Sequence, residues 1–321
     1  MSELSTYHTK SWKSAKPQLS ILIPFFRDNP CALLKSLEGL GTVSGIEVLA
    51  YDDGTGDNEL TAEISRSIKD CALPICIISN PVNQGRSAAR NALQDAARAD
   101  WVLFLDADMR PVKPSFLQDY LALIQQDIAD VIFGGFEVEK ITADKDRDLH
   151  RAFSETSDCL TLQERQAKGP QFVATSNLCV RKSVMIDEPF DSGFEGWGWE
   201  DSEWAARIAK THRLIHVDNP ALHLGLETTD TLLRRFKTSG HNYVRFTQKH
   251  PELAQSLTLY RVAKKLSVMP GHNLTRPILR ALVKGTFLPV SLRLSALKLW
   301  RASWYADALR KGTKAPEKAT A

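Results

Sequence analysis

Short apolar runs alternate with helix-period segments along the first 136 residues. The runs have the length and apolar content of buried strands, and the segments between them repeat apolar residues at helical spacing. The predicted strands are Leu19–Phe26, Ile46–Tyr51, Pro74–Ser79, Trp101–Leu105 and Asp130–Phe136, and the predicted helices are Cys31–Leu40, Asn58–Lys69, Arg86–Ala99 and Ser115–Gln126. This alternation predicts an α/β fold with a mostly parallel sheet sandwiched by helices.

The remainder of the chain has a weaker pattern. Residues 139–169 are charged and predicted to be helical in part, and residues 171–180 are predicted to form a pair of short strands. A Gly- and Trp-rich loop follows, and a helix is predicted to begin near Glu200. We therefore expect an N-terminal arm at 1–17, a main domain at 18–254 and a C-terminal helical extension at 255–321.

Composition is that of an ordinary globular protein, with 43% hydrophobic and 25% charged residues among 321. The five cysteines lack metal-type spacing and are expected to be reduced core residues. The first 18 residues lack the apolar core of a signal peptide, and no apolar run is long enough to span a membrane. These features predict a cytoplasmic protein.

The net charge of +3 is unevenly distributed. Residues 260–321 hold 13 Lys and Arg against two acids, whereas residues 1–259 hold 28 basic and 36 acidic residues. The basic stretch at 260–314 resembles amphipathic helices broken near Pro289, a pattern typical of attachment to an anionic membrane surface. The alternative is that these helices pack on the main domain with their basic faces in water. Nucleic acid is the weaker candidate for an anionic partner.

Polar residues follow four of the predicted strands. They include Asp52–Asp53 after the second strand and Asp106 and Asp108 after the fourth. In extended backbone, side chains two residues apart point to the same side, so Asp106 and Asp108 could together bind a divalent cation. The alternative is a solvated turn, in which Asp is common.

Five motifs occur in order along the chain. They are Ile-Pro-Phe-Phe-Arg at 23–27, Tyr-Asp-Asp-Gly-Thr-Gly-Asp at 51–57, Asn-Gln-Gly-Arg-Ser-Ala-Ala-Arg-Asn at 83–91, Asp-Ala-Asp at 106–108 and Gly-Trp-Gly-Trp-Glu-Asp at 196–201. The series resembles the family 2 glycosyltransferases, which are inverting nucleotide-sugar enzymes of the GT-A fold. The resemblance covers roughly residues 18–226.

The resemblance implies a binding site for a nucleoside-diphosphate sugar and a divalent cation. The implied nucleotide-sugar contacts are Pro24, Phe25, Arg27, Asp52, Asp53, Arg86 and Asp106. The implied ligands of Mn²⁺ or Mg²⁺ are Asp106, Asp108 and His223, with His216 a weaker candidate than His223. Arg90 is expected either at the diphosphate or in a buried ion pair. Arg27 stands where the family usually has Asn, and Gly56 loosens the second motif, so the nucleotide is left open among UDP, GDP and dTDP.

The Glu200–Asp201 pair is the implied reaction centre. An inverting transfer requires one carboxylate to take the proton from the acceptor hydroxyl, and a helix N-terminus keeps a carboxylate ionised. The resemblance assigns Asp201 as the base and Glu200 to orienting a hydroxyl, whereas helix capping is the simpler explanation of both. Trp197 and Trp199 are expected either to bind the acceptor or to lie in the core.

These inferences predict a metal-dependent inverting glycosyltransferase, either a hexosyl- or an N-acetylhexosaminyltransferase, using a nucleoside-diphosphate sugar, with a UDP-sugar favoured. The expected acceptor is a hydroxyl of a glycan, free or lipid-linked, in cell-surface polysaccharide or lipopolysaccharide synthesis. Two alternatives stay open. One is a sugar nucleotidyltransferase, which would need a Gly-rich phosphate loop after the first strand, and the other is an inactive scaffold that binds nucleotide sugars.

Overall fold

A computed structural model describes residues 4–41, 43–140 and 144–312. The chain divides into two compact units, each built from three segments. The sheet unit comprises residues 1–139, 159–192 and 204–225, and the helical unit comprises residues 140–158, 193–203 and 226–321. This division differs from the predicted boundary at 255, because the C-terminal residues form one unit with two segments from the middle of the chain.

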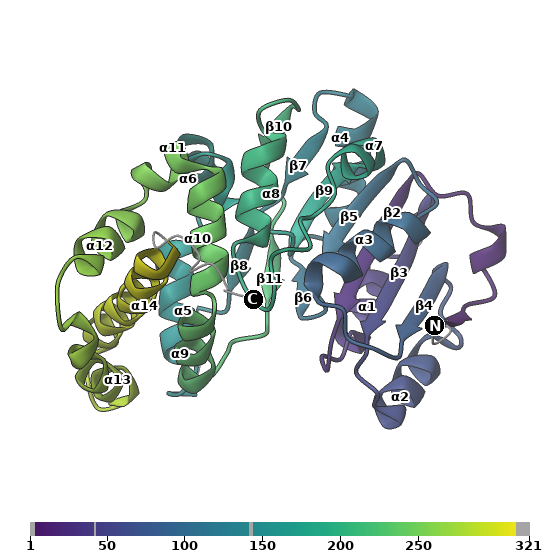
Figure 1. The fold of residues 1–321 in the computed structure, drawn as a ribbon. Helices are drawn as coiled ribbons and strands as arrows, with labels where there is room; N and C mark the ends of the chain where they lie inside the picture. The colour runs from purple at the N-terminus through teal and green to yellow at the C-terminus, as the bar shows by residue number, and fades with distance from the viewer. Residues whose placement is uncertain (1–3, 42, 141–143, 313–321) are drawn as a thin grey trace, which may run out of the picture. The chain divides into compact units, whose positions relative to one another are not determined.

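In the described part of the chain, the sheet unit holds one eight-stranded and one three-stranded sheet (Figure 1). The large sheet has the order β1 (Ser5–His8), β4 (Ile75–Asn80), β3 (Ile46–Asp53), β2 (Leu19–Phe25), β5 (Trp101–Leu105), β9 (Asn177–Arg181), β7 (Val131–Phe133), β10 (Leu214–His216). The small sheet has the order β6 (Met109–Pro111), β11 (Ala221–His223), β8 (Phe136–Val138).

The four central strands β4, β3, β2 and β5 are parallel, as the alternation predicted. Two features differ from the prediction. Part of the N-terminal arm is strand β1, which pairs antiparallel with β4. Within residues 171–180, where two strands were predicted, the structure has the end of a short helix and the start of β9, which is antiparallel to both of its neighbours.

Helices cover both faces of the large sheet (Figure 1). Alternate residues of β2 point to opposite faces, so Ile21 packs in one core cluster with Leu33 of α1, and Leu22 packs in the other with Leu93 of α3. The helical segments of this unit are η1 (Trp12–Ser14), α1 (Cys31–Gly39), α2 (Asn58–Ile68), α3 (Arg86–Ala96), α4 (Phe116–Gln126), α6 (Leu162–Lys168), η2 (Pro170–Phe172), α7 (Lys182–Asp187) and the part of α8 (Glu200–Ile208) that begins at Trp204. The predicted sandwich is confirmed.

A fully buried amide fixes the corner between the two sheets. Asn177, at the start of β9, accepts a hydrogen bond from the Tyr120 hydroxyl at 2.8 Å. Its amide nitrogen donates to the carbonyl oxygens of Gly135 at 2.7 Å and Asn219 at 2.8 Å. Gly134 is required here, because a Cβ at that position would lie 2.3 Å from the Tyr120 hydroxyl. The network therefore satisfies backbone groups that a bend between strands would otherwise leave unpaired.

Replacing Asn177 with Leu is expected to lower the free energy of unfolding by about 3 to 5 kcal/mol, because three hydrogen bonds to buried polar groups are lost. Urea denaturation monitored by circular dichroism measures this change. The control is Gln118→Leu, which removes an exposed amide on α4 and should change stability by less than about 0.5 kcal/mol. Equal stabilities of the two variants would contradict the structural role of Asn177.

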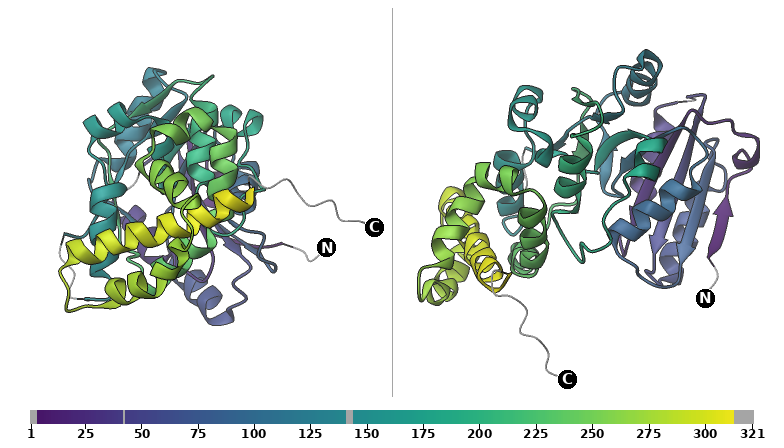
Figure 2. Two further views of the ribbon diagram at one scale, coloured as in Figure 1. Left: turned by 60° about the vertical axis from the view of Figure 1, so that its left-hand side comes forward. Right: turned by 45° about the horizontal axis from the view of Figure 1, so that its top comes forward.

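The helical unit is built around its last helix. The helices are α5 (Asp148–Ser157), α9 (Thr229–Thr238), α10 (Gly240–Lys249), α11 (Pro251–Ser256), α12 (Thr258–Ser267), η3 (His272–Thr275), α13 (Arg276–Lys284) and α14 (Val290–Gly312), together with the first turn of α8. Helix α14 packs against α5, α9, α10, α12 and α13, and Figure 2 shows it as the long yellow helix beside its neighbours. The predicted break near Pro289 is confirmed as the connection between α13 and α14.

Side chains of the basic tail are part of this core. Arg293 is fully buried, binds Asp148 of α5 at 2.8 Å and donates to the carbonyl oxygen of Val283 at 3.0 Å. The indole N–H of Trp300 donates to the carbonyl oxygen of Leu233 in α9 at 3.0 Å. The inner faces of the predicted amphipathic helices therefore pack on other helices. Over the described residues, no helix is both long and apolar enough to cross a bilayer.

Candidate active site

Asp53 ties the end of β3 to the loop before α3. Its two carboxylate oxygens accept hydrogen bonds from the backbone N–H groups of Gln84 at 2.9 Å and Gly85 at 2.8 Å. Burial raises the pKa of Asp53, although these two hydrogen bonds oppose the shift. Gly54 is required for the close approach, because a Cβ there would lie 2.3 Å from the nitrogen of Asn83. Asp53 therefore fixes the N-terminus of α3.

Asp52 lies at the same edge of the sheet and is buried, with Phe25 of β2 and Ser79 of β4 as its register partners. One of its carboxylate oxygens accepts a hydrogen bond from the backbone N–H of Thr55 at 2.9 Å. The hydroxyl of Thr55 in turn accepts from the backbone N–H of Arg27 at 2.8 Å. Asp52 thus organises the loops that follow β3 and β2.

The first predicted motif is split between core and surface. Phe25 is buried among the core residues under α1, so the predicted nucleotide contact through its side chain is not supported. Pro24 is half-buried, while Phe26 is 38% exposed and Arg27 lies over its ring at 4.9 Å. Sequence reasoning missed Phe26, because consecutive residues of a strand cannot be assigned to core or surface until the register is known.

Two arginines of α3 have different environments. Arg86 is exposed in the first turn of the helix, and its charge lowers the pKa of Asp108. Arg90 is 1% exposed, and its guanidinium lies 3.8 Å from the Asp106 carboxylate and over the ring of Phe190. Of the two roles expected for Arg90, the structure has the buried ion pair. Arg86 lies at a helix N-terminus, a position that favours anions, and its nucleotide contact stays a prediction.

Asp108 and His223, which are 115 residues apart in sequence, meet at the edge of the small sheet. The Nε2 atom of His223 lies 3.1 Å from a carboxylate oxygen of Asp108, because β11 pairs with β6 directly after the acidic motif. Burial raises the pKa of Asp108, but the hydrogen bond and charge of His223 outweigh it, so the pKa is lowered. Gly225 permits this arrangement, since a Cβ there would lie 1.8 Å from the same carboxylate oxygen.

The chemistry of this pair fits a divalent metal. A carboxylate oxygen with an imidazole nitrogen suits Mn²⁺ well, whereas Mg²⁺ prefers oxygen ligands alone. Among the described residues, no group of three or more His, Cys, Asp or Glu side chains could hold a metal ion. Asp106, the third predicted ligand, is the partner of Arg90. Asp108 and His223 are therefore the two protein donors that the structure brings together.

His216 does not fit the weaker metal-ligand prediction. It lies in β10 with its ring 5.8 Å from that of Phe133. Burial, together with the charge of Arg165, lowers its pKa to about 4. His216 therefore packs against Phe133 in the last strand of the large sheet.

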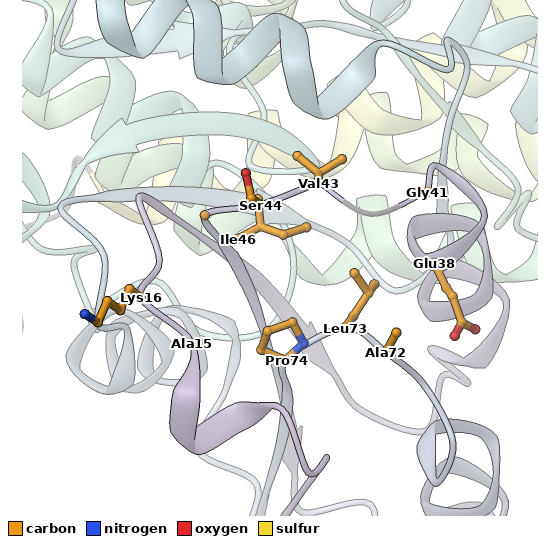
Figure 3. Close-up of a pocket in the computed structure, with 11 residues that line it drawn as sticks. Ala15, Lys16, Glu38, Gly41, Val43, Ser44, Ile46, Ala72, Leu73 and Pro74 are labelled. Atoms are coloured by element: carbon orange, nitrogen blue, oxygen red, sulfur yellow. The ribbon is translucent and has the colours of Figure 1, made fainter.

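A separate pocket lies at the opposite end of the sheet (Figure 3). Its lining includes Ile46 at the start of β3 and Pro74 just before β4, with Lys16 and Glu38 at its margin. Ligands of open α/β sheets bind beyond the carboxyl ends of the strands, where Asp52 lies. This pocket is therefore not the candidate site.

The helical unit carries Glu200 and Asp201. Helix α8 begins at Glu200, as predicted, so both carboxylates lie in its first turn; Glu200 is buried and Asp201 is half-buried. The preceding loop is held by Asn242 of α10, whose side chain exchanges hydrogen bonds with the backbone of Glu195. These hydrogen bonds give Asp201 a defined position in the first turn of α8.

The two tryptophans of this loop pack within the helical unit. Trp199 has a φ of 78°, donates its indole N–H to the Tyr305 hydroxyl at 3.1 Å and packs on Tyr243 with ring centroids 4.8 Å apart. Trp197 lies 5.7 Å from the ring of Phe236. Both side chains are half-buried, so packing accounts for much of their surface. An acceptor role stays a prediction for both.

Comparisons with known proteins agree with this architecture. Residues 20–187 match the family described as Glycosyl transferase family 2. An uncharacterized glycosyltransferase of Haemophilus influenzae (strain ATCC 51907 / DSM 11121 / KW20 / Rd) is 28% identical over 179 residues, which are 53% of this chain and 65% of that protein. A probable polypeptide N-acetylgalactosaminyltransferase 8 of Homo sapiens is 28% identical over 147 residues, 42% of this chain and 23% of that protein. The matches thus span less than two thirds of these relatives.

Solved structures share the fold at low sequence identity. The mannosyltransferase PcManGT of Pyrobaculum calidifontis, in complex with GDP-Man and Mn²⁺, has a TM-score of 0.59 and 13% identity, covering 90% of this chain and 87% of that one. S. aureus TarS 1–349 with UDP-GlcNAc has a TM-score of 0.52 and 15% identity, covering 92% and 90%. With the family match spanning more than half of its length, this chain has the GT-A fold and belongs to glycosyl transferase family 2.

Proposed function

We propose that this protein is a metal-dependent inverting glycosyltransferase that moves a hexose or N-acetylhexosamine from a nucleoside-diphosphate sugar, most simply a UDP-sugar, to a glycan hydroxyl. The observation that carries the proposal is the contact between Asp108, in the loop after β5, and His223 at the end of β11, both in the sheet unit. Fold relatives that bind a nucleotide sugar, with Mn²⁺ in one case, support it.

The proposed donor site uses the carboxyl edge of the sheet. Asp52 accepts hydrogen bonds from the base or the ribose, and Asp53 holds the N-terminus of α3 through Gln84 and Gly85. Arg86 supplies positive charge to the diphosphate, and the exposed ring of Phe26 offers a surface for the base. Asp106, oriented by Arg90, contacts the ribose or the sugar.

Asp108 and His223 are the proposed holders of Mn²⁺, with Mg²⁺ the weaker fit. When bound, the metal neutralises negative charge on the diphosphate leaving group. Two protein donors would be enough for a cation that is bound mainly through its substrate. The lowered pKa of Asp108 keeps its carboxylate available as a ligand.

Asp201 is the proposed general base. It takes the proton from the acceptor hydroxyl while that oxygen attacks the anomeric carbon on the face opposite the leaving group, so one bond forms as the other breaks and the configuration inverts. Glu200 orients a hydroxyl of the donor or acceptor. The rigid attachment of the loop to α10 and α14 reduces the motion of both carboxylates.

The proposed acceptor is a growing cell-surface glycan, free or lipid-linked, and the proposed location is the cytoplasmic face of the membrane. Support comes from residues 258–306, which contain nine Lys or Arg and no acid. Such a stretch is attracted to anionic lipid headgroups.

A ligand panel tests the proposed function. Thermal unfolding is followed with UDP, GDP or dTDP in the presence of Mn²⁺, Mg²⁺ or a chelator, and the best donor is then incubated with glycan acceptors. We expect stabilisation by UDP that depends on Mn²⁺, and a product of inverted anomeric configuration by NMR. Release of pyrophosphate would instead support a nucleotidyltransferase, and tight nucleotide binding without transfer or hydrolysis would support a scaffold.

A further inference from the structure

Exposed apolar side chains gather around α13 of the helical unit. Of the fifteen large apolar side chains that the described residues expose, seven lie between residues 268 and 299, which is a tenth of the chain. The most exposed are Phe287 at 88%, Val268 at 81%, Leu274 at 76%, Ile278 at 65% and Met269 at 53%. We call these five residues the apolar tip.

The apolar tip is confined to one short part of the fold. Val268 and Met269 follow the last turn of α12, and Leu274 lies in η3, which leads directly into α13. Ile278 lies in the first turn of α13, and Phe287 lies in the connection from α13 to α14. All five residues lie within the segment 268–287, which contains the whole of α13, a helix of nine residues and therefore about 14 Å long.

These side chains are additional to the core. Helix α13 already buries Val283, and its Leu279 and Leu282 pack against the cluster that includes Trp300. Ile278 and Leu274 point away from that cluster, because they remain mostly exposed. Apolar residues on the outer side of a helix whose inner side is already packed are not explained by folding, and such patches mark interaction surfaces.

The charge around the apolar tip indicates its partner. Lys264 and Lys265 occupy the last turn of α12, four and three residues before Val268, and Arg280 stands two residues after Ile278. All three cations are exposed, and no acidic residue occurs between Thr258 and Ala306. Exposed aliphatic and aromatic side chains flanked by cations fit the interface of a bilayer containing anionic phospholipid.

We propose that the apolar tip inserts into an anionic phospholipid bilayer while Lys264, Lys265 and Arg280 bind the headgroup phosphates. This mode differs from amphipathic helices lying flat on lipid, because the inner faces of these helices are buried in the protein. The inference rests on the membrane location proposed above and names the residues that bind the lipid. It does not depend on the glycosyl transfer, since lipid binding is measured without donor or acceptor.

Vesicle sedimentation of the full-length protein tests the proposal. Vesicles of phosphatidylcholine with about a quarter phosphatidylglycerol are compared with vesicles of phosphatidylcholine alone. The wild type should sediment with the anionic vesicles and be released by high salt. Point variants are preferable to truncation of residues 270–321, since that segment contains buried residues such as Arg293 and Trp300.

The apolar contribution is tested with the double variant Ile278→Ser/Phe287→Ser, which should reduce partitioning at least tenfold. The matched control is Val82→Ser/Val112→Ser, which changes two exposed apolar residues of the sheet unit and should bind as the wild type does. Circular dichroism confirms that each variant is folded. Equal binding by the wild type and the Ile278/Phe287 variant would overturn the proposal, as would absence of wild-type binding.

The electrostatic contribution is tested with Lys264→Gln/Lys265→Gln, which should weaken binding to anionic vesicles by about fivefold per lysine. The control Lys35→Gln/Lys69→Gln removes two exposed lysines of the sheet unit. Light scattering on the same samples tests whether a second copy of the protein, rather than a membrane, covers the apolar tip. A wild-type dimer that Phe287→Ser converts to a monomer would assign the apolar tip to self-association and overturn membrane insertion.

Discussion

Replacing Asp201 with Asn is expected to lower kcat by about 10³-fold while the affinity for the donor nucleotide changes little. The substitution preserves size and removes only the ability to take a proton, and general bases contribute about 10² to 10⁴ in rate. Because Asp201 lies in the first turn of α8, the neutral amide should not disturb the helix. Initial-rate kinetics with the donor identified by the ligand panel, together with nucleotide titration by calorimetry, measures the two quantities separately.

The matched control for this prediction is Glu195→Gln, which changes an exposed carboxylate of the same loop whose backbone contacts Asn242. Its kcat should stay within about twofold of the wild type. If Asp201→Asn retained a kcat within threefold of the wild type, the proton would be taken by another group. A fall in nucleotide affinity equal to the fall in kcat would instead point to a binding role.

The βα units at the start of the chain were predictable because their information is local. Each strand is an apolar run, and each helix repeats its apolar residues at helical spacing, so the core faces of β2, α1 and α3 follow from neighbouring residues alone. The parallel order of the central strands follows from the same alternation. β1 was not predicted, because its four residues are all exposed and lack an apolar pattern.

The helical unit was not predictable as a unit, since it joins three segments that are far apart in sequence. The contacts that define it include Arg293 with Asp148, across 145 residues, and Trp199 with Tyr305, across 106 residues. Neither pair has a signature in local composition. The tail was therefore predicted to be helical, while the burial of its inner face became visible only in the structure.

At the candidate site, one contact between predicted residues was foreseen, and the environment of the individual residues was not. The family resemblance placed Asp108 and His223 together, and the structure confirms that they are in contact. It also assigned Phe25 to the nucleotide, whereas the strand register buries Phe25 and exposes Phe26. Arg90 was expected either at the diphosphate or in a buried ion pair. The packing of α3 on the sheet, which the sequence does not reveal, places it beside Asp106.

Asp108→Asn is expected to raise the Mn²⁺ concentration needed for half-maximal nucleotide binding by about 10²-fold, and to lower kcat/KM by at least as much. An amide oxygen is neutral and binds a hard cation far more weakly than a carboxylate does. Asn is preferable to a larger residue, because Gly225 leaves no room beyond the carboxylate oxygen. Calorimetric titration of UDP at several Mn²⁺ concentrations provides a readout that does not require turnover.

The matched control for Asp108→Asn is Asp218→Asn, which neutralises a carboxylate with 76% side-chain exposure in the turn before β11 and changes total charge equally. Its Mn²⁺ dependence should equal that of the wild type. A change common to both variants would show that general electrostatic attraction, rather than ligation, accounts for the effect. If Asp108→Asn left Mn²⁺ dependence unchanged, the contact with His223 would be structural. Any metal would then have to bind without the Asp108 carboxylate that the fold holds against His223.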